Sequence, residues 1–272
     1  MKRLYLYSLL IFVLSLAVYG GYEIYGRMTT DTTIPIFELE SERIEVSIKD
    51  GEEALLQGVA AYDEKDGDIS NRILIESLSR FVDGTRVITY AAFDRDNHVG
   101  KATREVVYSD YVSPMFSSTT GFRFPMRSTS LIEGLQAVDC IEGDITSQVK
   151  VSPGFYVDTY ETGFYGIQYQ VASRAGDVEY LPITVEIYDP ATESKNPQIE
   201  LNNYIVYTTV GKKIDAASYI EEATIGTIKV TKSDVNIDES EVNYDEPGVY
   251  EIIYSLRSGE NRGTNRLVVV VR

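Results

Sequence analysis

The chain opens with an uncharged hydrophobic stretch and then changes to short alternating segments. Residues 4–22 contain no charged side chain, and Glu23 follows at the far end. A helix of this length rises about 30 Å, which is enough to cross the hydrocarbon core of a bilayer. Tyrosines cluster toward both ends of the stretch, as they do at membrane interfaces. The pattern therefore predicts a transmembrane helix within residues 1–26.

The same stretch has an alternative interpretation as a secretory signal peptide. A cleaved signal usually has an apolar core of about 7–15 residues followed by a small-x-small site. Val18-Tyr19-Gly20 is only a weak site of this kind, which favours an uncleaved signal anchor. Lys2 and Arg3 orient the N-terminus toward the cytoplasm by the positive-inside rule. We therefore expect a single-pass cell-membrane protein whose C-terminal part is extracellular, or a secreted protein if the segment is cleaved.

Beyond residue 33 the hydrophobic pattern has a period of two. Within residues 85–93, Ile88, Tyr90 and Ala92 fall on one face and threonines and Val87 on the other. Clusters of Gly, Pro, Asp and Asn separate many such short segments. This arrangement is typical of antiparallel β-sandwiches, so the fold class expected after the helix is all-β.

Two motifs recur along the chain with a period of about 76–85 residues. The pattern A-x-D-x-x-[DE]-G-D-I-[ST] occurs at residues 61–70 and 137–146. The pattern G-x-x-x-I-x-Y occurs three times, and a proline precedes the first apolar segment of each copy. Residues 225–228 lack the acidic turn of the first two copies. The predicted organisation is an anchor (1–26), a linker (27–33), domain 1 (34–111), domain 2 (112–189), a linker (190–196) and domain 3 (197–272).

These copies resemble the bacterial immunoglobulin-like (Ig-like) repeats of Gram-positive surface and secreted proteins. That group is similar to the Ig-like domain of a pesticidal crystal protein and, more distantly, to hyalin repeats. Its pattern D-x-x-D-G-D-I-T followed by G-x-Y-x-V-x-Y is met most fully by residues 34–110, less fully by 113–189, and without the acidic turn by 197–272. The resemblance implies three tandem Ig-like antiparallel sandwiches in a surface setting, and it implies no ligand.

The motifs also have local physical meanings. A glycine in the acidic turn, such as Gly67, suits positive φ, and a flanking aspartate can accept backbone N–H bonds. Gly84, Gly163 and Gly248 precede strands where the chain turns, so positive φ is expected there as well. Tyr165 and Tyr250 stand two residues further on, as in a tyrosine corner, whereas the first copy has Arg86 at that position.

Charge and composition exclude several function classes. The chain has 42 acidic and 25 basic residues and a net charge of −17, which argues against binding nucleic acid. Cys140 is the single cysteine, so it cannot form an intrachain disulfide. We expect it to be exposed, either as an inert thiol or in an intermolecular bridge. His98 is the single histidine, which excludes sites that need two imidazoles.

The candidate chemical sites favour structural interpretations. The spacing of Asp63, Asp66 and Asp68 does not match a calcium-binding loop, and residues 94–98 are nearer but have Gly100 too late. Turn capping is therefore preferred to calcium binding. His98 is expected in a solvated hairpin with no nucleophile motif. The sequence predicts no catalytic, cofactor-binding or metal-binding residue, and no enzyme.

The function expected from these features is that of a membrane-anchored extracellular structural or adhesion protein. It would be a rod of Ig-like domains that gives reach and a surface for weak protein or glycan contacts. The alternative is a carbohydrate- or protein-binding module that uses an exposed sheet edge or aromatic patch. The short first joint, residues 110–114, is expected to be nearly rigid, and the longer polar joint at residues 189–197 to be looser.

Overall fold

The computed structural model describes residues 2–29, 31–82 and 84–272. Met1 of the predicted anchor, Thr30 of the predicted linker and Asp83 lie outside the described residues. The chain is mostly β and begins with one apolar helix. It forms two compact units, Met1–Asp110 and Tyr111–Arg272. Each unit is described by itself below.

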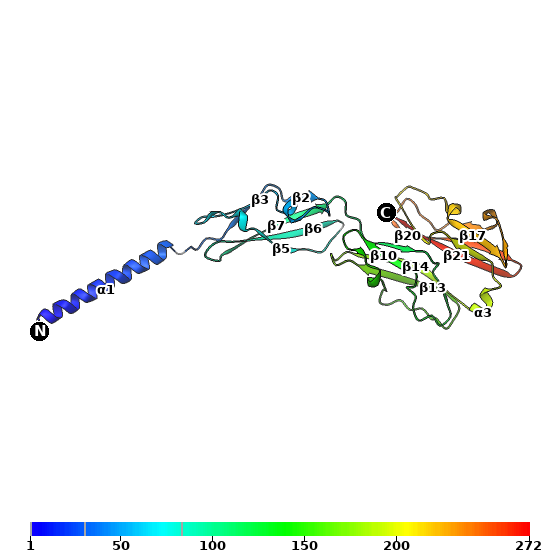
Figure 1. Ribbon diagram of the computed structural model, residues 1–272, viewed down its shortest axis with the longest axis horizontal. Coiled ribbons are helices and arrows are strands. Elements are labelled where there is room, and N and C mark those ends of the chain that lie inside the picture. Colours follow the sequence, from blue (N-terminus) through cyan, green and yellow to red (C-terminus); the bar gives the residue numbers. More distant parts are fainter. Residues whose placement is uncertain (1, 30, 83) are drawn as a thin grey trace. The chain divides into compact units, whose positions relative to one another are not determined.

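The first unit begins with helix α1, Lys2–Thr29, which extends three residues beyond the predicted anchor (Figure 1). Its segment Tyr7–Gly26 covers 20 residues with a mean hydropathy of 1.5, and none of it is buried. Within the described residues it is the one helix that is long and apolar enough to cross a membrane. The predicted helix is thus present, with an apolar surface that no part of the described chain covers.

The remainder of the first unit is the first strand set, β1 to β7. Its strands are β1 (Ile36–Leu39), β2 (Arg43–Val46), β3 (Val59–Asp63), β4 (Gly67–Asp68), β5 (Leu74–Leu78), β6 (Thr85–Phe93) and β7 (Val99–Tyr108). A short helix, α2 (Glu52–Leu55), and a 3-10 turn, η1 (Ser70–Arg72), connect them.

The second unit contains two further strand sets. The second set has β8 (Met115–Ser118), β9 (Arg123–Pro125), β10 (Leu135–Asp139), β11 (Gly143–Asp144), η2 (Thr146–Gln148), β12 (Lys150–Val151), β13 (Gly163–Ala172) and β14 (Val178–Tyr188). Helix α3 (Pro190–Glu193) follows it. The third set has β15 (Gln198–Leu201), β16 (Ile205–Thr208), η3 (Ala216–Tyr219), β17 (Ile220–Ile225), β18 (Ile228–Lys229), η4 (Lys232–Asp234), β19 (Asn236–Asp238), β20 (Gly248–Ser258) and β21 (Asn261–Val271).

The same strand pairing occurs in all three sets. Each has a three-stranded sheet, ordered β1-β3-β4 in the first set, and a four-stranded sheet, ordered β2-β7-β6-β5. The corresponding orders are β8-β10-β11 and β9-β14-β13-β12, then β15-β17-β18 and β16-β21-β20-β19. The pairs β2–β7, β9–β14 and β16–β21 are parallel, and the other pairs are antiparallel. Each set therefore contains seven strands in two sheets.

The two sheets of each set enclose a core made of the alternating residues. In the first set, Ala61 of β3 packs with Ile88, Tyr90 and Val106 of the four-stranded sheet, and all four are fully buried. Strand β6 has the predicted bounds, and its face of Ile88, Tyr90 and Ala92 is the buried one, as expected. Two sheets that face each other across such a core form a β-sandwich.

Three equivalent tyrosines fasten these cores. Tyr90, Tyr169 and Tyr254 end the repeated G-x-x-x-I-x-Y motif, and each ring is fully buried. Each hydroxyl donates to a backbone carbonyl 35–38 residues earlier, namely Leu55 O at 2.6 Å, Leu131 O, and Ala216 O at 2.8 Å. A buried hydroxyl needs such a partner. Tyrosine therefore suits this motif position because its ring fills the core and its hydroxyl group donates a hydrogen bond to the backbone.

The predicted tyrosine corners are present in the second and third sets. The Tyr165 hydroxyl donates to Glu161 O at 3.1 Å, and the Tyr250 hydroxyl donates to Glu246 O at 3.2 Å. In the first set, Arg86 Nε donates to Ser79 O at 2.6 Å, and its guanidinium lies over the Phe81 ring. An arginine therefore replaces the corner tyrosine in a different bonding arrangement.

The glycine that precedes each of these strands follows the prediction in one set of three. Gly84 has a φ of +74°, as expected, but Gly163 and Gly248 lie outside the left-handed region. At Gly248 a Cβ would lie 2.9 Å from the Tyr250 hydroxyl oxygen. Glycine is needed there because the corner tyrosine approaches the backbone closely, and the predicted positive φ was wrong at these two positions.

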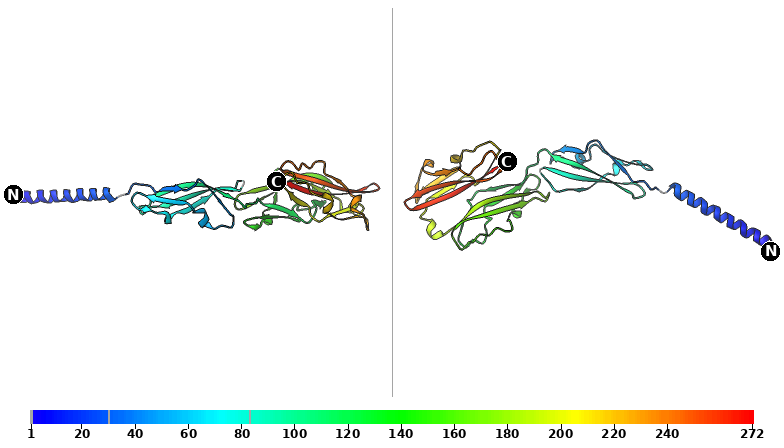
Figure 2. Two further views of the ribbon diagram at one scale, coloured as in Figure 1. Left: turned by 90° about the horizontal axis from the view of Figure 1, so that it is seen from above. Right: turned by 180° about the vertical axis from the view of Figure 1, so that it is seen from behind.

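The expectation of a loose joint at residues 189–197 is also wrong. The second and third sets belong to one compact unit, and their buried residues form one continuous hydrophobic cluster. In Figures 1 and 2, β13 and β14 lie alongside β20 and β21, and β14 contacts β20. Asp189 caps helix α3 by accepting from the Ala191 N–H. The polar linker is thus a short capped helix beside a packed interface.

Candidate functional site

The acidic turns of the first two sets are capped in the way the sequence predicts. Asp63 Oδ1 accepts the N–H groups of Lys65 and Asp66, each at 2.9 Å, and Asp139 Oδ1 accepts those of Ile141 and Glu142 at 2.8 Å. Gly67 and Gly143 have φ values of +73° and +75° at the same turn position. Asp63 and Asp139 therefore stabilise tight turns.

A second role emerges where the first acidic turn meets the β6–β7 hairpin. Asp31, Thr33, Asp63, Asp94 and His98 come together there, and we call this group the first corner. The Thr33 hydroxyl donates to Asp31 Oδ1 at 2.6 Å and approaches Asp63 Oδ2 at 3.2 Å. A carboxylate oxygen of Asp31, one of Asp94 and a ring nitrogen of His98 lie within 4.8 Å of one another.

Close packing holds the chain ahead of β1 against this hairpin. A Cβ on Gly100 of β7 would lie 2.0 Å from the carbonyl oxygen of Pro35, so only glycine fits at that crossing. The crossing fixes the path of residues 31–35 over the sheet. It thereby brings Asp31 to the hairpin although 63 positions separate Asp31 from Asp94 in the sequence.

The carboxylates of the first corner are buried, and their protonation follows from their hydrogen bonds. Hydrogen bonds from the Thr33 hydroxyl and N–H lower the pKa of Asp31. Burial opposes ionisation of Asp94, but bonds from the His98 N–H and ring outweigh it and lower the pKa of Asp94. The hydrogen bond to Asp94, at 2.6 Å, raises the pKa of His98. His98 lies in the β6–β7 hairpin, as predicted, and its side chain is 33% exposed and bonded to Asp94.

The second set has a different group of side chains at the equivalent place, without an imidazole. Ser173 stands where the first set has Asp94, since each donates its N–H to the carbonyl four residues on. Asp177 stands where the first set has His98, and it accepts from the Tyr111 hydroxyl at 2.6 Å. Burial, followed by this bond to Asp177, raises the pKa of Tyr111. We call Tyr111, Asp139, Ser173 and Asp177 the second corner.

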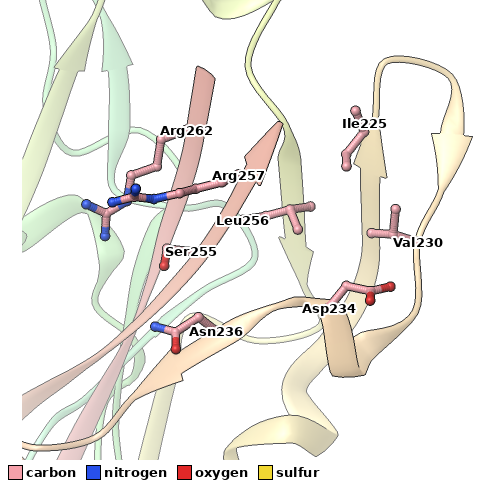
Figure 3. Close-up of a pocket in the computed structure, with 8 residues that line it drawn as sticks. All are labelled: Ile225, Val230, Asp234, Asn236, Ser255, Leu256, Arg257 and Arg262. Carbon is pink, nitrogen blue, oxygen red and sulfur yellow. The ribbon is translucent and has the colours of Figure 1, made fainter. Parts of the chain in front are cut away.

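The third set lacks the acidic turn and has a groove in its place. A tight turn at Gly226 joins β17 to β18, and it contains no acidic residue, as the sequence of residues 225–228 indicates. The groove has a volume of about 790 Å³, and Ile225, Val230 and Leu256 contribute its apolar wall. Arg257 and Arg262, which pair across β20 and β21, lie close together at its other side (Figure 3).

The interface between the second and third sets contains a buried ion-pair cluster. Arg123 of β9 pairs with Glu186 of β14 at 2.7 Å and with Glu193 of α3 at 2.7 Å, and all three side chains are 15–17% exposed. Glu186 also accepts from the Thr264 hydroxyl of the third set at 3.3 Å. We call Arg123, Glu186 and Glu193 the joint cluster.

Further contacts extend this joint along both sets. The Phe116 N–H donates to the Tyr207 hydroxyl at 2.7 Å, and the Thr184 N–H donates to Glu251. Arg266, which pairs with Glu251 at 2.8 Å, places its guanidinium over the Phe164 ring at 4.9 Å. The joint therefore combines apolar, polar and charged contacts, and the two sets resist independent movement.

Exposed aromatic side chains gather in one loop of the second set. Phe155, Tyr156 and Tyr160 lie between β12 and β13, with exposed fractions of 42%, 80% and 70%. Phe155 also lines a groove of about 380 Å³ that Val249 and Tyr250 of the third set complete. Cys140 is exposed, as predicted, and its sulfur accepts from the Val112 N–H at 3.5 Å.

Sequence reasoning singled out His98 and the aspartates of the turns, but it did not name Asp31. Asp31 lies outside both repeated motifs, and only its position four residues before Pro35 marks it. Asp110 and Glu193 occupy the same position before Pro114 and Pro197. That periodic acidic residue was the available signal.

Comparisons with known proteins do not show a family. No family model matches the chain. An uncharacterized 81.3 kDa protein of Acholeplasma phage L2 is 28% identical over 109 residues, which is 38% of this chain. The chain spans about 15% of the length of that curated relative.

Solved structures give only weak likenesses. A chain with the M60 catalytic domain and two CBM51 domains of Clostridium perfringens ZmpB has a TM-score of 0.24 and 13% identity over 89% of this chain and 31% of that one. The lipoprotein BT2262 from Bacteroides thetaiotaomicron has a TM-score of 0.22 and 13% sequence identity, and the match covers 86% of this chain and 99% of that one. The protocadherin GammaB4 extracellular domain has a TM-score of 0.21 and 12% sequence identity, and the match covers 89% of this chain and 50% of that one.

Proposed function

We propose that this chain is a membrane-anchored extracellular structural or adhesion protein built from three Ig-like domains, with no enzymatic activity. The observation that carries the proposal is the seven-stranded pairing that recurs three times after a single apolar helix. Seven strands in two sheets, with corner tyrosines at Tyr165 and Tyr250, are features of the Ig architecture. Helix α1 would be the anchor, and the three sets would be displayed outside the cell.

The packed joint supports a structural role for the displayed part. The joint cluster and the continuous core tie the second and third sets into one body. A body of this kind resists bending between its domains, as an element that bears load or presents a surface should. The net charge of −17 favours solubility at high local density on a surface.

Cys140 provides a direct test of anchoring and orientation. It is the single cysteine and it is exposed, so a membrane-impermeant maleimide should label it on intact cells that express the full chain. We expect the labelled chain in the membrane fraction at full length, and no labelling of Cys140→Ser. Labelling that requires permeabilised cells would contradict the outward orientation, and a shortened chain in the medium would contradict the anchor.

The rod expected from the sequence stays a prediction. Three stacked sandwiches would span on the order of 90–110 Å. Small-angle scattering of the full chain, measured in detergent whose contribution is matched out, tests it. A compact particle would contradict the rod without affecting the anchor.

A second candidate function is glycan or protein binding through the exposed aromatic loop. Phe155, Tyr156 and Tyr160 provide the observation that favours it, because amphipathic rings at the surface suit contacts with sugars and proteins. A glycan array probed with the full chain and with Tyr156→Ala/Tyr160→Ala tests it. Loss of binding in this variant but not in Tyr62→Ala, whose ring is 43% exposed in the first set, is expected. Equal binding by both variants would contradict it.

A further inference from the structure

We infer that Asp31, Asp94 and His98 form a divalent transition-metal site, best suited to Zn²⁺, that fastens the segment after α1 to the β6–β7 hairpin. The three candidate ligand atoms already lie within 4.8 Å of one another. Asp31 follows the end of α1 at Thr29 by two positions, whereas Asp94 and His98 belong to the β6–β7 hairpin. A bound ion would therefore join the region next to the predicted anchor to the first sandwich.

A buried oxygen without a partner marks the place of the ion. Asp31 is 8% exposed, and its Oδ1 accepts both the N–H and the hydroxyl of Thr33. Its Oδ2 is buried and has no hydrogen-bond partner among the described residues. Leaving a buried charged oxygen unsatisfied is costly, so a ligand at this atom would be strongly favoured.

The charge balance of the corner points to a cation. Asp31, Asp63 and Asp94 are all buried, with exposed fractions of 8%, 5% and 5%. The ammonium group of Lys65, which is bonded to Asp96 at 2.6 Å, also attracts Asp31, but a single such cation offsets only part of the charge of three carboxylates. Three buried carboxylates with one imidazole between them leave an excess of negative charge, and buried charges persist when they are paired or coordinate a metal.

The donor set selects a transition metal over calcium. Calcium and magnesium take oxygen ligands, whereas imidazole suits zinc and related metals. Zinc accepts imidazole nitrogen and carboxylate oxygen at about 2.0–2.2 Å, and sites with three protein ligands keep one position for water. The ion would replace the proton shared by Asp94 Oδ2 and His98 Nδ1, which are 2.6 Å apart, and that proton would pass to solvent.

The second corner shows that the buried oxygen alone does not make the site. Asp139 Oδ2 is also buried without a hydrogen-bond partner in the part of the chain that the structure describes, and Asp139 is 2% exposed. However, Ser173 replaces the second carboxylate there, and the Tyr111 hydroxyl satisfies Asp177. The second corner thus lacks the imidazole and has a serine in place of the Asp94 carboxylate, so the inferred site belongs to the first set alone.

The test uses the untagged full chain in detergent micelles, with Cys140→Ser as the background so that no thiol binds the metal. Calorimetry with ZnCl₂ should show one ion per chain and a proton released on binding. Because His98 is the single histidine, its imidazole ¹⁵N resonances report ligation without ambiguity. We expect the Nδ1 resonance to shift when zinc is added.

Two ligand variants and a matched control complete the test. Asp31→Asn keeps the oxygen that accepts from Thr33 and removes the charge, and His98→Gln removes the imidazole. Loss of a partner that only orients a ligand weakens metal affinity by about 10–100-fold, so each variant should weaken it by at least about 100-fold. Asp96→Asn, on the same hairpin but exposed and paired with Lys65, should bind zinc like the background.

The stability of Asp31→Asn separates a lost site from a lost fold. Without metal it should unfold cooperatively, as the background does, and zinc should leave its Tm unchanged. The background should gain Tm with zinc. Unshifted imidazole resonances, or zinc binding retained in either ligand variant, would overturn the inference. Binding of Ca²⁺ in preference to Zn²⁺ would also overturn it.

Discussion

The first and second strand sets share their strand pairing and differ in what lies at their ends. The first set has its own hydrophobic core, separate from the cluster that the second and third sets form together. At the corner, the first set has Asp94 and His98 where the second has Ser173 and Asp177. The pairing is thus a constant framework, and a few residues outside the repeated motifs decide how each set joins its surroundings.

The largest effect that would test this difference is expected at the joint cluster. Arg123→Ala leaves Glu186 and Glu193 buried without their cation, and breaking such a pair from one side costs about 3–5 kcal/mol. In urea unfolding, the transition of the second unit should move to lower denaturant, and that of the first set should stay in place.

Lys229→Ala is the matched control for the joint cluster. Lys229 pairs with Glu222 at 2.6 Å, but both side chains are far more exposed than Arg123. Exposed pairs contribute at most about 1 kcal/mol. An effect of Arg123→Ala no larger than that of Lys229→Ala would contradict the role given to the joint.

The core tyrosines give the next largest effect. Tyr90→Phe and Tyr169→Phe each leave a partly buried carbonyl without its donor, which costs about 1–2 kcal/mol. Tyr90→Phe should destabilise the first set alone. Tyr169→Phe should destabilise the second and third sets together, because they share one core. Segment-resolved hydrogen exchange distinguishes the two results, and a second set that opens while the third stays protected would speak against the shared core.

The smallest effect concerns the acidic turns in acid. Hydrogen bonds from Ser70 and Thr146 lower the pKa of Asp68 and Asp144. A lowered pKa means that the stabilisation is complete above the ordinary aspartate pKa and is lost as the pH falls through the lower folded-state value. Asp68→Asn should flatten the acid dependence of Tm for the first set below about pH 4, and Asp144→Asn should do so for the second unit. Unchanged acid profiles in both variants would exclude these turns as contributors.

The elements that the sequence predicts well depend on local rules. The bounds of β6, the burial of Ile88 and Tyr90, and the positive φ of Gly67 follow from period-two alternation and from turn chemistry. The corner tyrosine Tyr165 also depends on residues only four positions away. Such features need no knowledge of the rest of the fold.

The features that the sequence did not predict depend on distant residues. The sequence predicts that residues 189–197 form the looser of the two joints, but Arg123, some 70 positions earlier, binds Glu193 and holds that segment in place. Asp31 meets Asp94 because Pro35 crosses Gly100, and neither motif contains that crossing. The sequence predicts a positive φ at Gly248, but the glycine is needed because the Tyr250 side chain lies against its backbone. The spacing of the motif does not reveal that contact.

The central structural claim is that the second and third sets form one body and that the first set is separate. Native-state hydrogen exchange of the full chain, measured by mass spectrometry across a urea series, tests it most directly. The account predicts that residues 115–188 and 198–271 lose protection at one urea concentration, whereas residues 36–108 lose it at another. Separate opening of residues 115–188 and 198–271 would contradict the account.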